Sequence, residues 1–179
     1  MQNNLMKYKN ILLFYFLSPI YCLGQNDNNI FSNEIDINSV NWITLPQAEY
    51  LLKEENKYIL LFFYREGCEF CEKMKTQTFK DLEVVNLINH NFLPVMINGK
   101  DKKPILYNDS IYVNEKSNES DPPFFHNFFK HLVDLRNENY YWPTIVIIDK
   151  NYNKIIQGSG FWPRELAIRN FKYLLAKEK

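Results

Sequence analysis

The sequence has few cysteines, no net charge and no long hydrophobic run. Its 179 residues include three cysteines, and 21 basic side chains balance 21 acidic ones. Three cysteines are too few for a small domain held together by disulfides. A balanced charge gives no electrostatic reason to expect nucleic acid or a charged membrane surface as a partner. The chain is nevertheless 46% hydrophobic and 16% aromatic, so it is too apolar for disorder and can bury one core.

The N-terminus has the pattern of an export signal. Two lysines precede the apolar run 11–17, which is too short to span a bilayer because a span takes about 20 residues. Cys22 and Gly24 are the small residues of a cleavage site before Gln25, so we expect the protein to be exported. A lipid anchor on Cys22 is the less favoured alternative, because Tyr21 stands where that modification needs a small residue.

After this signal peptide, 1–24, and a flexible leader rich in Asn and Asp, 25–41, the sequence predicts one α/β domain over 42–179. The apolar run 58–64 is typical of a central strand that is buried on both faces. The pattern as a whole predicts a β-α-β unit followed later by a β-β-α unit. Thr44 and Gln47 have the spacing of a capping box, which predicts a helix from Thr44 to about Asn56. The other expected elements are a strand at 58–64, helices at 68–78 and from Asp81, strands at 92–98, 144–149 and 154–157, and a helix at 164–177.

The segment between the two units, 99–141, is too long for a plain connection and carries signals of its own. Apolar stretches at 105–107 and 111–113 flank a short polar turn and predict a hairpin. Apolar residues also recur at helical spacing after Pro122 and Pro123, and we expect this stripe to pack in the core rather than to line a ligand pocket. Its members are Phe124, Phe125, Phe128, Phe129, Leu132 and Val133.

Cys68 and Cys71 are the two cysteines that remain after the signal peptide, and they follow the first predicted strand by a short turn. Their spacing places both sulfurs on one helical turn, close enough for a disulfide. Unpaired N–H groups and the helix dipole favour a thiolate at the first cysteine, so Cys68 is the expected nucleophile. Cys71, one turn further and more shielded, would resolve the mixed disulfide. The pattern therefore predicts a redox-active centre whose potential is tuned by Glu69 and Phe70.

Two other roles for the cysteine pair are open. A zinc site needs four ligands, and no second cysteine pair exists. His126 and His131 lie five residues apart, which places them on different sides of one helix. We therefore expect neither a metal nor another cofactor. A permanently closed structural disulfide is the stronger alternative, although closing a loop of two residues stabilises a fold only slightly.

Further motifs follow one another along the chain: the strand before Cys68, then Cys71-Glu72-Lys73-Met74, Thr78-Phe79, Tyr141-Trp142-Pro143-Thr144 and Gly160-Phe161. Taken as a set, over Trp42 to Ala176, they resemble the motifs of the exported thioredoxin-like proteins of bacteria. The resemblance implies a thioredoxin-like fold, with a four-stranded mixed sheet flanked by helices and a hairpin-plus-helix insertion before a cis-proline. It also implies that Pro143 is cis and faces the sulfur of Cys68, and that the backbone of Trp142 binds a substrate peptide as an added strand.

The sequence departs from the thioredoxin pattern around the cysteines. Gly67 stands where thioredoxins have a tryptophan, and Phe62 stands where they have a buried acid. Without that acid, Cys71 must lose its proton by another route, either to water or to Glu72. A residue as bulky as Trp142 is expected to restrict which peptides can bind.

The expected function is that of an exported, periplasmic thiol:disulfide oxidoreductase that acts as a monomer. Glu66, Glu69 and Glu72 surround the cysteines and disfavour a thiolate, which predicts a reducing protein with a potential of roughly −200 to −270 mV. Its partners would be cysteine-containing exported proteins and a thiol-transferring electron donor in the membrane. The alternative is a non-catalytic binding module with a closed disulfide, whose partner surface lies on the insertion, 99–141.

Overall fold

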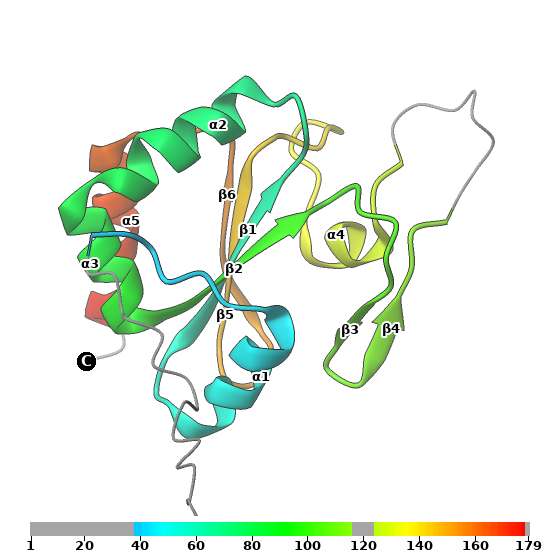
Figure 1. Cartoon of the computed structure of the whole chain (residues 1–179), viewed down its shortest axis with the longest axis horizontal. Helices are drawn as coiled ribbons and strands as arrows, with labels where there is room; N and C mark the ends of the chain where they lie inside the picture. The colour runs from blue at the N-terminus through cyan, green and yellow to red at the C-terminus, as the bar shows by residue number, and fades with distance from the viewer. Residues whose placement is uncertain (1–37, 116–123, 178–179) are drawn as a thin grey trace, which may run out of the picture. The chain divides into compact units, whose positions relative to one another are not determined.

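A four-stranded mixed sheet lies at the centre of the computed structural model, which describes residues 38–115 and 124–177 (Figure 1). Its strand order is β2-β1-β5-β6. β1 runs parallel to β2 and antiparallel to β5, and β5 is antiparallel to β6. The predicted mixed sheet is therefore confirmed. The strands are β1 (Tyr58–Tyr64), β2 (Phe92–Asn98), β5 (Thr144–Ile148) and β6 (Lys154–Ser159).

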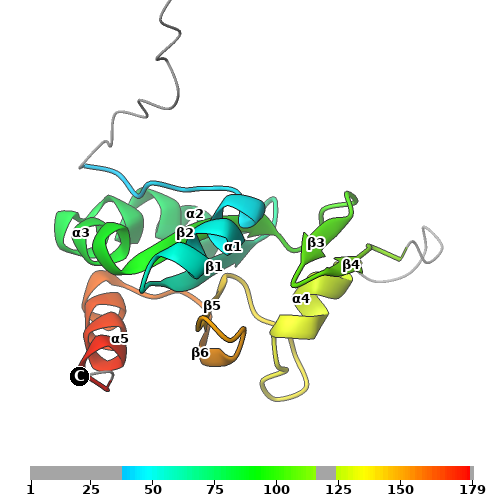
Figure 2. The same cartoon turned by 90° about the horizontal axis from the view of Figure 1, so that it is seen from below.

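Three helices pack on one face of the sheet. They are α2 (Glu69–Thr76), α3 (Leu82–Asn91) and α5 (Arg164–Lys177), with a 3-10 turn, η1 (Thr78–Lys80), between the first two. Leu60 and Phe62 of β1 point to this face and join one buried cluster with side chains of α2, α3 and α5. The second view shows these helices together on one side of the strands (Figure 2).

The opposite face carries α1 (Leu45–Glu54) and the segment between β2 and β5. This segment forms a hairpin of β3 (Ile105–Tyr107) and β4 (Ser110–Tyr112), followed by α4 (Asn127–Leu132). Ile59, Leu61 and Phe63 of β1 point to this side. Because successive side chains of a strand point to opposite faces, one apolar run supplies both cores, as predicted.

Local signals explain most of the boundaries. Thr44 and Gln47 form the predicted capping box at the start of α1, with the Gln47 N–H donating to the Thr44 hydroxyl at 3.4 Å. Asp81 caps α3 by accepting the N–H groups of Glu83 and Val84, each at 3.1 Å. Among the residues that the structure describes, no helix is long and apolar enough to cross a membrane.

The helix of the insertion is shorter than predicted. It begins after His126, whose fully buried ring accepts the Phe128 N–H at Nδ1, at 3.0 Å, and bonds the Lys103 carbonyl at Nε2, also at 3.0 Å. This cap starts the helix, so Phe124 and Phe125 precede it. The expectation of core packing holds for the helical part of the stripe. Its fully or nearly fully buried members are Phe128, Phe129, Leu132 and Val133.

The core also begins earlier than the predicted domain boundary at Trp42. Val40 is 5% exposed and belongs to the core of the α2 face. The Asn89 side chain fixes this segment to α3, because it accepts the Asn41 N–H at 3.0 Å and donates to the Ser39 carbonyl at 2.9 Å. The predicted signal peptide and most of the leader lie outside the described residues.

Candidate active site

A left-handed glycine turns the chain from β1 into the helix that carries the cysteines. Gly67 has a φ of +65°, and a Cβ built at this position would have no heavy atom within 4 Å. Glycine adopts this conformation without the steric cost that other residues meet. Because this turn requires a left-handed backbone, a glycine stands before Cys68 where thioredoxins have a tryptophan. The absence of a side chain at Gly67 leaves open space beside the cysteine.

Cys68 and Cys71 form a disulfide at the N-terminus of α2. Their Cα atoms are 5.2 Å apart, and Cys68 is the N-cap residue, with its sulfur accepting the Cys71 N–H at 3.1 Å. Cys68 is 5% exposed and Cys71 is fully buried. A backbone N–H directed at the first sulfur stabilises negative charge there when the pair is reduced. Both cysteines are thus buried in the disulfide form, and the attacking and resolving roles remain predictions.

The two residues between the cysteines face outward. Phe70 is 50% exposed, and its ring stacks on that of Phe161 with 6.2 Å between centroids. Glu69 bonds Lys73 at 3.0 Å, one helical turn further along. The side chains of Glu69 and Lys73 are 77% and 42% exposed, so solvent screens the effect of this ion pair on the cysteines.

Glu72, the other carboxylate of this helix, bonds Lys75 at 2.9 Å. The two acids of α2 thus both have lysine partners. On the sequence alone, Glu66, Glu69 and Glu72 count as free carboxylates that repel a thiolate. Because two of them are paired with lysines, this repulsion is smaller, and these charges give a weaker reason to expect a reducing potential.

An aromatic cluster lies beneath the cysteines where thioredoxins would have a buried acid. Phe62 is fully buried, with its ring edge-on to Phe79 at 5.0 Å. The buried polar residues of the described chain are Thr78, His126 and Thr144, none of which is a carboxylic acid or a lysine. The described part of the protein therefore offers no buried acid to take the proton of Cys71.

The Trp142–Pro143 segment lies at the same end of the sheet as the cysteines. The peptide bond between the two residues is cis. Thr144 pairs with Phe63, so the segment before Thr144 lies beside the end of β1, from which the Cys68 turn departs. The Pro143 carbonyl accepts the Gly160 N–H at 2.7 Å. Among the described residues, the N–H and C=O of Trp142 have no hydrogen-bond partner.

The ring of Trp142 is directed toward the insertion. It is stacked on Phe129 with 4.5 Å between centroids and lies parallel to Phe125 at 5.9 Å. Sequence reasoning missed Phe129 as part of this site. It also missed Gly99, where a Cβ would overlap the indole. The sequence showed only a glycine at the end of a predicted strand. The residue that requires this glycine, Trp142, is far away in the sequence.

The histidines considered as zinc ligands lie apart from the cysteines. His126 is buried at the start of α4, and the ring of His131 is tilted against that of Tyr112 with 5.0 Å between centroids. Both belong to the α4 side of the sheet, whereas the cysteines pack on the α2 side. No group of three His, Cys, Asp or Glu side chains within 38–115 and 124–177 could hold a metal ion.

The sheet order, the helices on each face and the disulfide at the N-terminus of α2 define a thioredoxin-like α/β fold. The chain belongs to the thioredoxin-like domain family, whose model matches residues 45–174. The predicted fold class is thus confirmed.

Relatives of known sequence and structure agree with this fold. Spermatogenesis-associated protein 20 of Rattus norvegicus is 30% identical over 129 residues, which are 72% of this chain. The match spans only 14% of that much longer protein. A thioredoxin from Thermus thermophilus covers 78% of this chain and 89% of its own, with a TM-score of 0.54 and 17% identity. A putative disulphide-isomerase from Bacteroides thetaiotaomicron covers 79% and 98%, with a TM-score of 0.53 and 13% identity. At these identities, the solved structures show the fold alone.

Proposed function

We propose that this protein is a thiol:disulfide oxidoreductase that reduces protein disulfides through Cys68 and Cys71. The observation that carries the proposal is the disulfide at the N-terminus of α2, with the Cys71 N–H donating to the Cys68 sulfur at 3.1 Å. Family membership supports the same chemistry, since this fold is matched over residues 45–174. The small stabilisation gained by closing so short a loop argues against a purely structural bridge.

The reaction begins with the reduced pair and proceeds in two exchanges. The Cys68 thiolate attacks one sulfur of a substrate disulfide, forming a mixed disulfide and releasing the other substrate sulfur as a thiolate. Cys71 then attacks the Cys68 sulfur, which closes the internal disulfide and releases the second substrate sulfur. Two electrons pass from the protein to the substrate, so a thiol donor must reduce the pair again.

The proton of Cys71 must leave without a buried acid. Glu72 is the nearest carboxylate in sequence, but its side chain is 60% exposed and bonded to Lys75. This arrangement favours water as the acceptor, which must take the proton before Cys71 attacks the Cys68 sulfur. The exchange rate should therefore depend on solvent access to Cys71 more than on any single side chain.

The substrate is proposed to bind beside Trp142 as an added strand. The unpartnered N–H and C=O of this residue give an extended peptide two backbone groups to bond, next to the sheet end that carries Cys68. Phe70, half exposed beside the disulfide, offers an apolar contact to the same peptide. The substrates we propose are cysteine-containing exported proteins.

The direction of transfer is proposed to be reducing, and the compartment the periplasm. The N-terminal signal pattern supports export, and an oxidising compartment requires a reducing protein to draw electrons from a donor, here a thiol-transferring membrane protein. The residues between the cysteines, Glu69 and Phe70, include no basic side chain that would stabilise a thiolate, so the expected potential remains roughly −200 to −270 mV. A titration against glutathione checks this value, and a result more positive than about −150 mV would reverse the direction.

Trapping is the direct test of the proposed reaction. A Cys71→Ser variant lacks the resolving sulfur, so it should retain substrates on Cys68 as mixed disulfides that dithiothreitol releases. The matched control is the double variant with Cys68→Ser added, which should retain none. If the native compartment yields no more captured protein with Cys71→Ser than with the double variant, the proposed reaction is wrong.

A non-catalytic binding module is the second candidate, and one observation favours it. Three large apolar side chains of the hairpin region are exposed, Leu106 by 56%, Ile111 by 72% and Val113 by 43%. Leu106 and Ile111 are cross-strand partners, so they form one apolar face. The two candidates differ in turnover, because only the oxidoreductase reduces a disulfide substrate repeatedly.

A further inference from the structure

The end of β2 is shaped to admit the ring of Trp142. A Cβ at Gly99 would overlap Cη2 and Cζ3 of the indole and would lie 3.2 Å from the Phe129 ring. Gly99 has no left-handed backbone, unlike Gly67 and Gly160. The position therefore requires the absence of a side chain and not a special backbone conformation.

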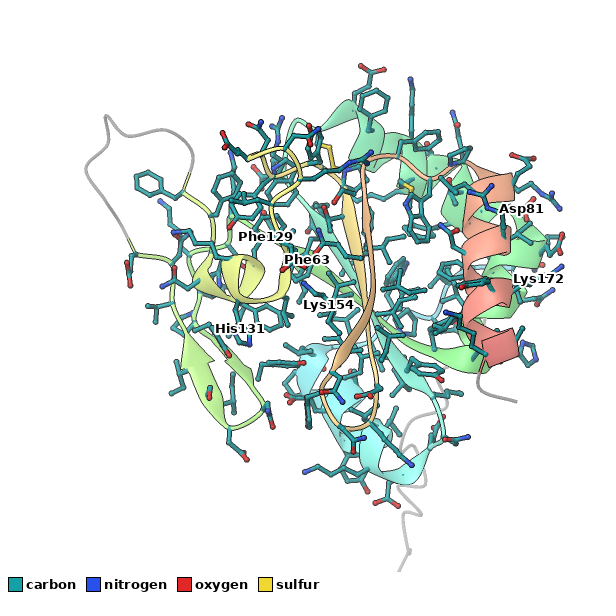
Figure 3. The ribbon with its side chains drawn as sticks, turned by 180° about the vertical axis from the view of Figure 1, so that it is seen from behind. Phe63, Asp81, Phe129, His131, Lys154 and Lys172 are labelled. Atoms are coloured by element: carbon teal, nitrogen blue, oxygen red, sulfur yellow. A yellow bond between two sulfur atoms is a disulfide. The ribbon has the colours of Figure 1, made fainter. Side chains whose placement is uncertain are left out.

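The indole is also held by α4. The rings of Trp142 and Phe129 are within 11° of parallel. Phe129 is in turn fixed against the sheet, because it is fully buried and stands edge-on to Phe63 at 5.2 Å. Figure 3 shows Phe63 and Phe129 beside one another on the α4 side. The indole thus stacks on a fixed ring, and the Gly99 backbone approaches the edge of both rings.

Backbone hydrogen bonds connect this contact to the cysteine turn. The Gly99 N–H donates to the Tyr64 carbonyl at 2.9 Å, and the Gly99 carbonyl accepts the His126 N–H at 2.8 Å. Tyr64 is the last residue of β1, so Gly99 links the strand that leads to Cys68 with the start of α4. A shift of α4 would therefore move both the residues around the indole and the strand end that leads to Cys68.

We propose that Gly99 and Phe129 are positioning residues that hold the Trp142 backbone where a substrate peptide binds. We call the two residues the indole clamp. The inference rests on the proposed function, and it gives the insertion a part in the reaction. Because the clamp acts only on the docking segment, peptide substrates depend on it, whereas a small dithiol that needs no docking reaches the cysteines without it.

The test compares two phenylalanines of α4. Phe129→Leu removes the ring that stacks on Trp142. Phe128→Leu is the matched control, because Phe128 is also fully buried, and its ring contacts in the described chain are with Phe63, Tyr107 and Tyr112. Both changes remove similar volume from the same core, so loss of stability alone affects them alike. Gly99→Ala is the second clamp variant and adds a methyl group against the indole.

The measurements are kcat and KM for a disulfide-bonded peptide, and the exchange rate with dithiothreitol. Phe129→Leu and Gly99→Ala should raise KM by roughly tenfold through misplacement of the docking backbone. Phe128→Leu should leave KM within about twofold, and dithiothreitol exchange should change by less than about twofold in all three variants.

Equal KM values for Phe128→Leu and Phe129→Leu would overturn the inference, as would an unchanged KM in Gly99→Ala. A parallel loss of dithiothreitol exchange would also overturn it, because the effect would then lie at the cysteines. These outcomes leave the proposed function intact if the unmodified protein reduces the peptide. An unmodified protein that exchanges with neither reagent contradicts the proposed function itself, and the inference with it.

Discussion

The two faces of the sheet serve the site in different ways. The α2 face holds the sulfur atoms over an aromatic cluster, and its helices α3 and α5 are joined at the surface by ion pairs that include Asp81 and Lys172. The α4 face holds the Trp142 ring through aromatic stacking. Figure 3 shows Asp81 and Lys172 on one side of the strands and Phe63 and Phe129 on the other.

The difference between the faces separates the reactivity of the sulfurs from the binding of the substrate peptide. The reactivity of the sulfurs depends on residues close to them in sequence, at the start of one helix. The position of the docking segment depends on an insertion whose contacts reach across the chain. Changes on the α2 face should therefore alter exchange with every thiol, whereas changes on the α4 face should alter reactions with peptides alone.

The largest effect is expected from the cysteines themselves. Cys68→Ser removes the nucleophile and should lower the rate of insulin reduction by at least about a thousandfold. Cys71→Ser should abolish repeated turnover while still forming one mixed disulfide per molecule, detected by mass spectrometry. A Cys68→Ser protein that turned over normally would place the chemistry elsewhere on the chain.

Two neighbouring residues of β1 offer the sharpest comparison of the faces. Phe62→Ala and Phe63→Ala each remove a fully buried ring, and each should lower the free energy of unfolding by about 3–5 kcal/mol. Phe62→Ala opens the α2 face beneath Cys71 and should raise the rate of exchange with dithiothreitol. Phe63→Ala loosens the support of Phe129 and should raise KM for peptides instead. Urea unfolding measures the stability of both variants, and kinetics measure their dithiothreitol exchange and their KM for peptides. If the two variants changed both kinetic quantities in the same way, the two faces would not have separate roles.

The ion pairs of the α2 face predict a smaller, pH-dependent effect. Burial tends to raise the pKa of Asp81, but hydrogen bonds from the Val84 N–H and from Arg164 outweigh it and lower the pKa below 3.8. Hydrogen bonding to Lys172 and the charge of Arg164 likewise lower the pKa of Glu83 below 4.5.

A carboxyl group whose pKa is lowered in the folded state stabilises the fold at pH values above its ordinary pKa. This stabilisation is lost as the pH falls through the folded-state pKa. Arg164→Met should therefore be less stable than the unmodified protein at pH 7, by less than a core substitution costs, and the gap should narrow below about pH 4. Urea unfolding at both pH values measures it. A gap that is constant with pH would show that the loss of Arg164 acts through packing alone.

The smallest effect is expected from the exposed charge beside Cys68. Glu69→Gln removes a negative charge near a thiolate, which stabilises the reduced pair and should make the potential more positive. An exposed charge at a helix N-terminus contributes about 0.3–1 kcal/mol, and 30 mV corresponds to about 1.4 kcal/mol, so the shift should be roughly 10 mV. Lys73→Gln, which removes the partner of Glu69, should shift the potential the other way. Shifts of the same sign would contradict a charge effect.

The sequence predicted those parts of the protein whose cause is local. The buried run of β1, the capping box at Thr44 and the placement of Cys68 at a helix start each follow from residues within one or two turns. The predicted hairpin depends on a similar short-range pattern, since Asn108 and Asp109 supply the positive φ angles that a two-residue turn needs. The order of the four-stranded sheet was expected from the resemblance to thioredoxin-like proteins instead.

What the sequence could not predict depends on distant partners. The start of α4 is set by a buried histidine that bonds Lys103, and the need for Gly99 is set by an indole near β5. Gly158 follows the same rule, because a Cβ there would overlap the ring of Trp162. Periodicity and capping signals carry no information about such contacts, so the docking half of the site became visible only in the folded chain.

Reduction of insulin in the presence of dithiothreitol tests the central claim most directly, because it asks whether the Cys68–Cys71 pair cycles. The account predicts repeated turnover by the unmodified protein and none by Cys68→Ser. An unmodified protein that fails to reduce insulin, with a disulfide that resists dithiothreitol, would contradict the account and favour a binding module.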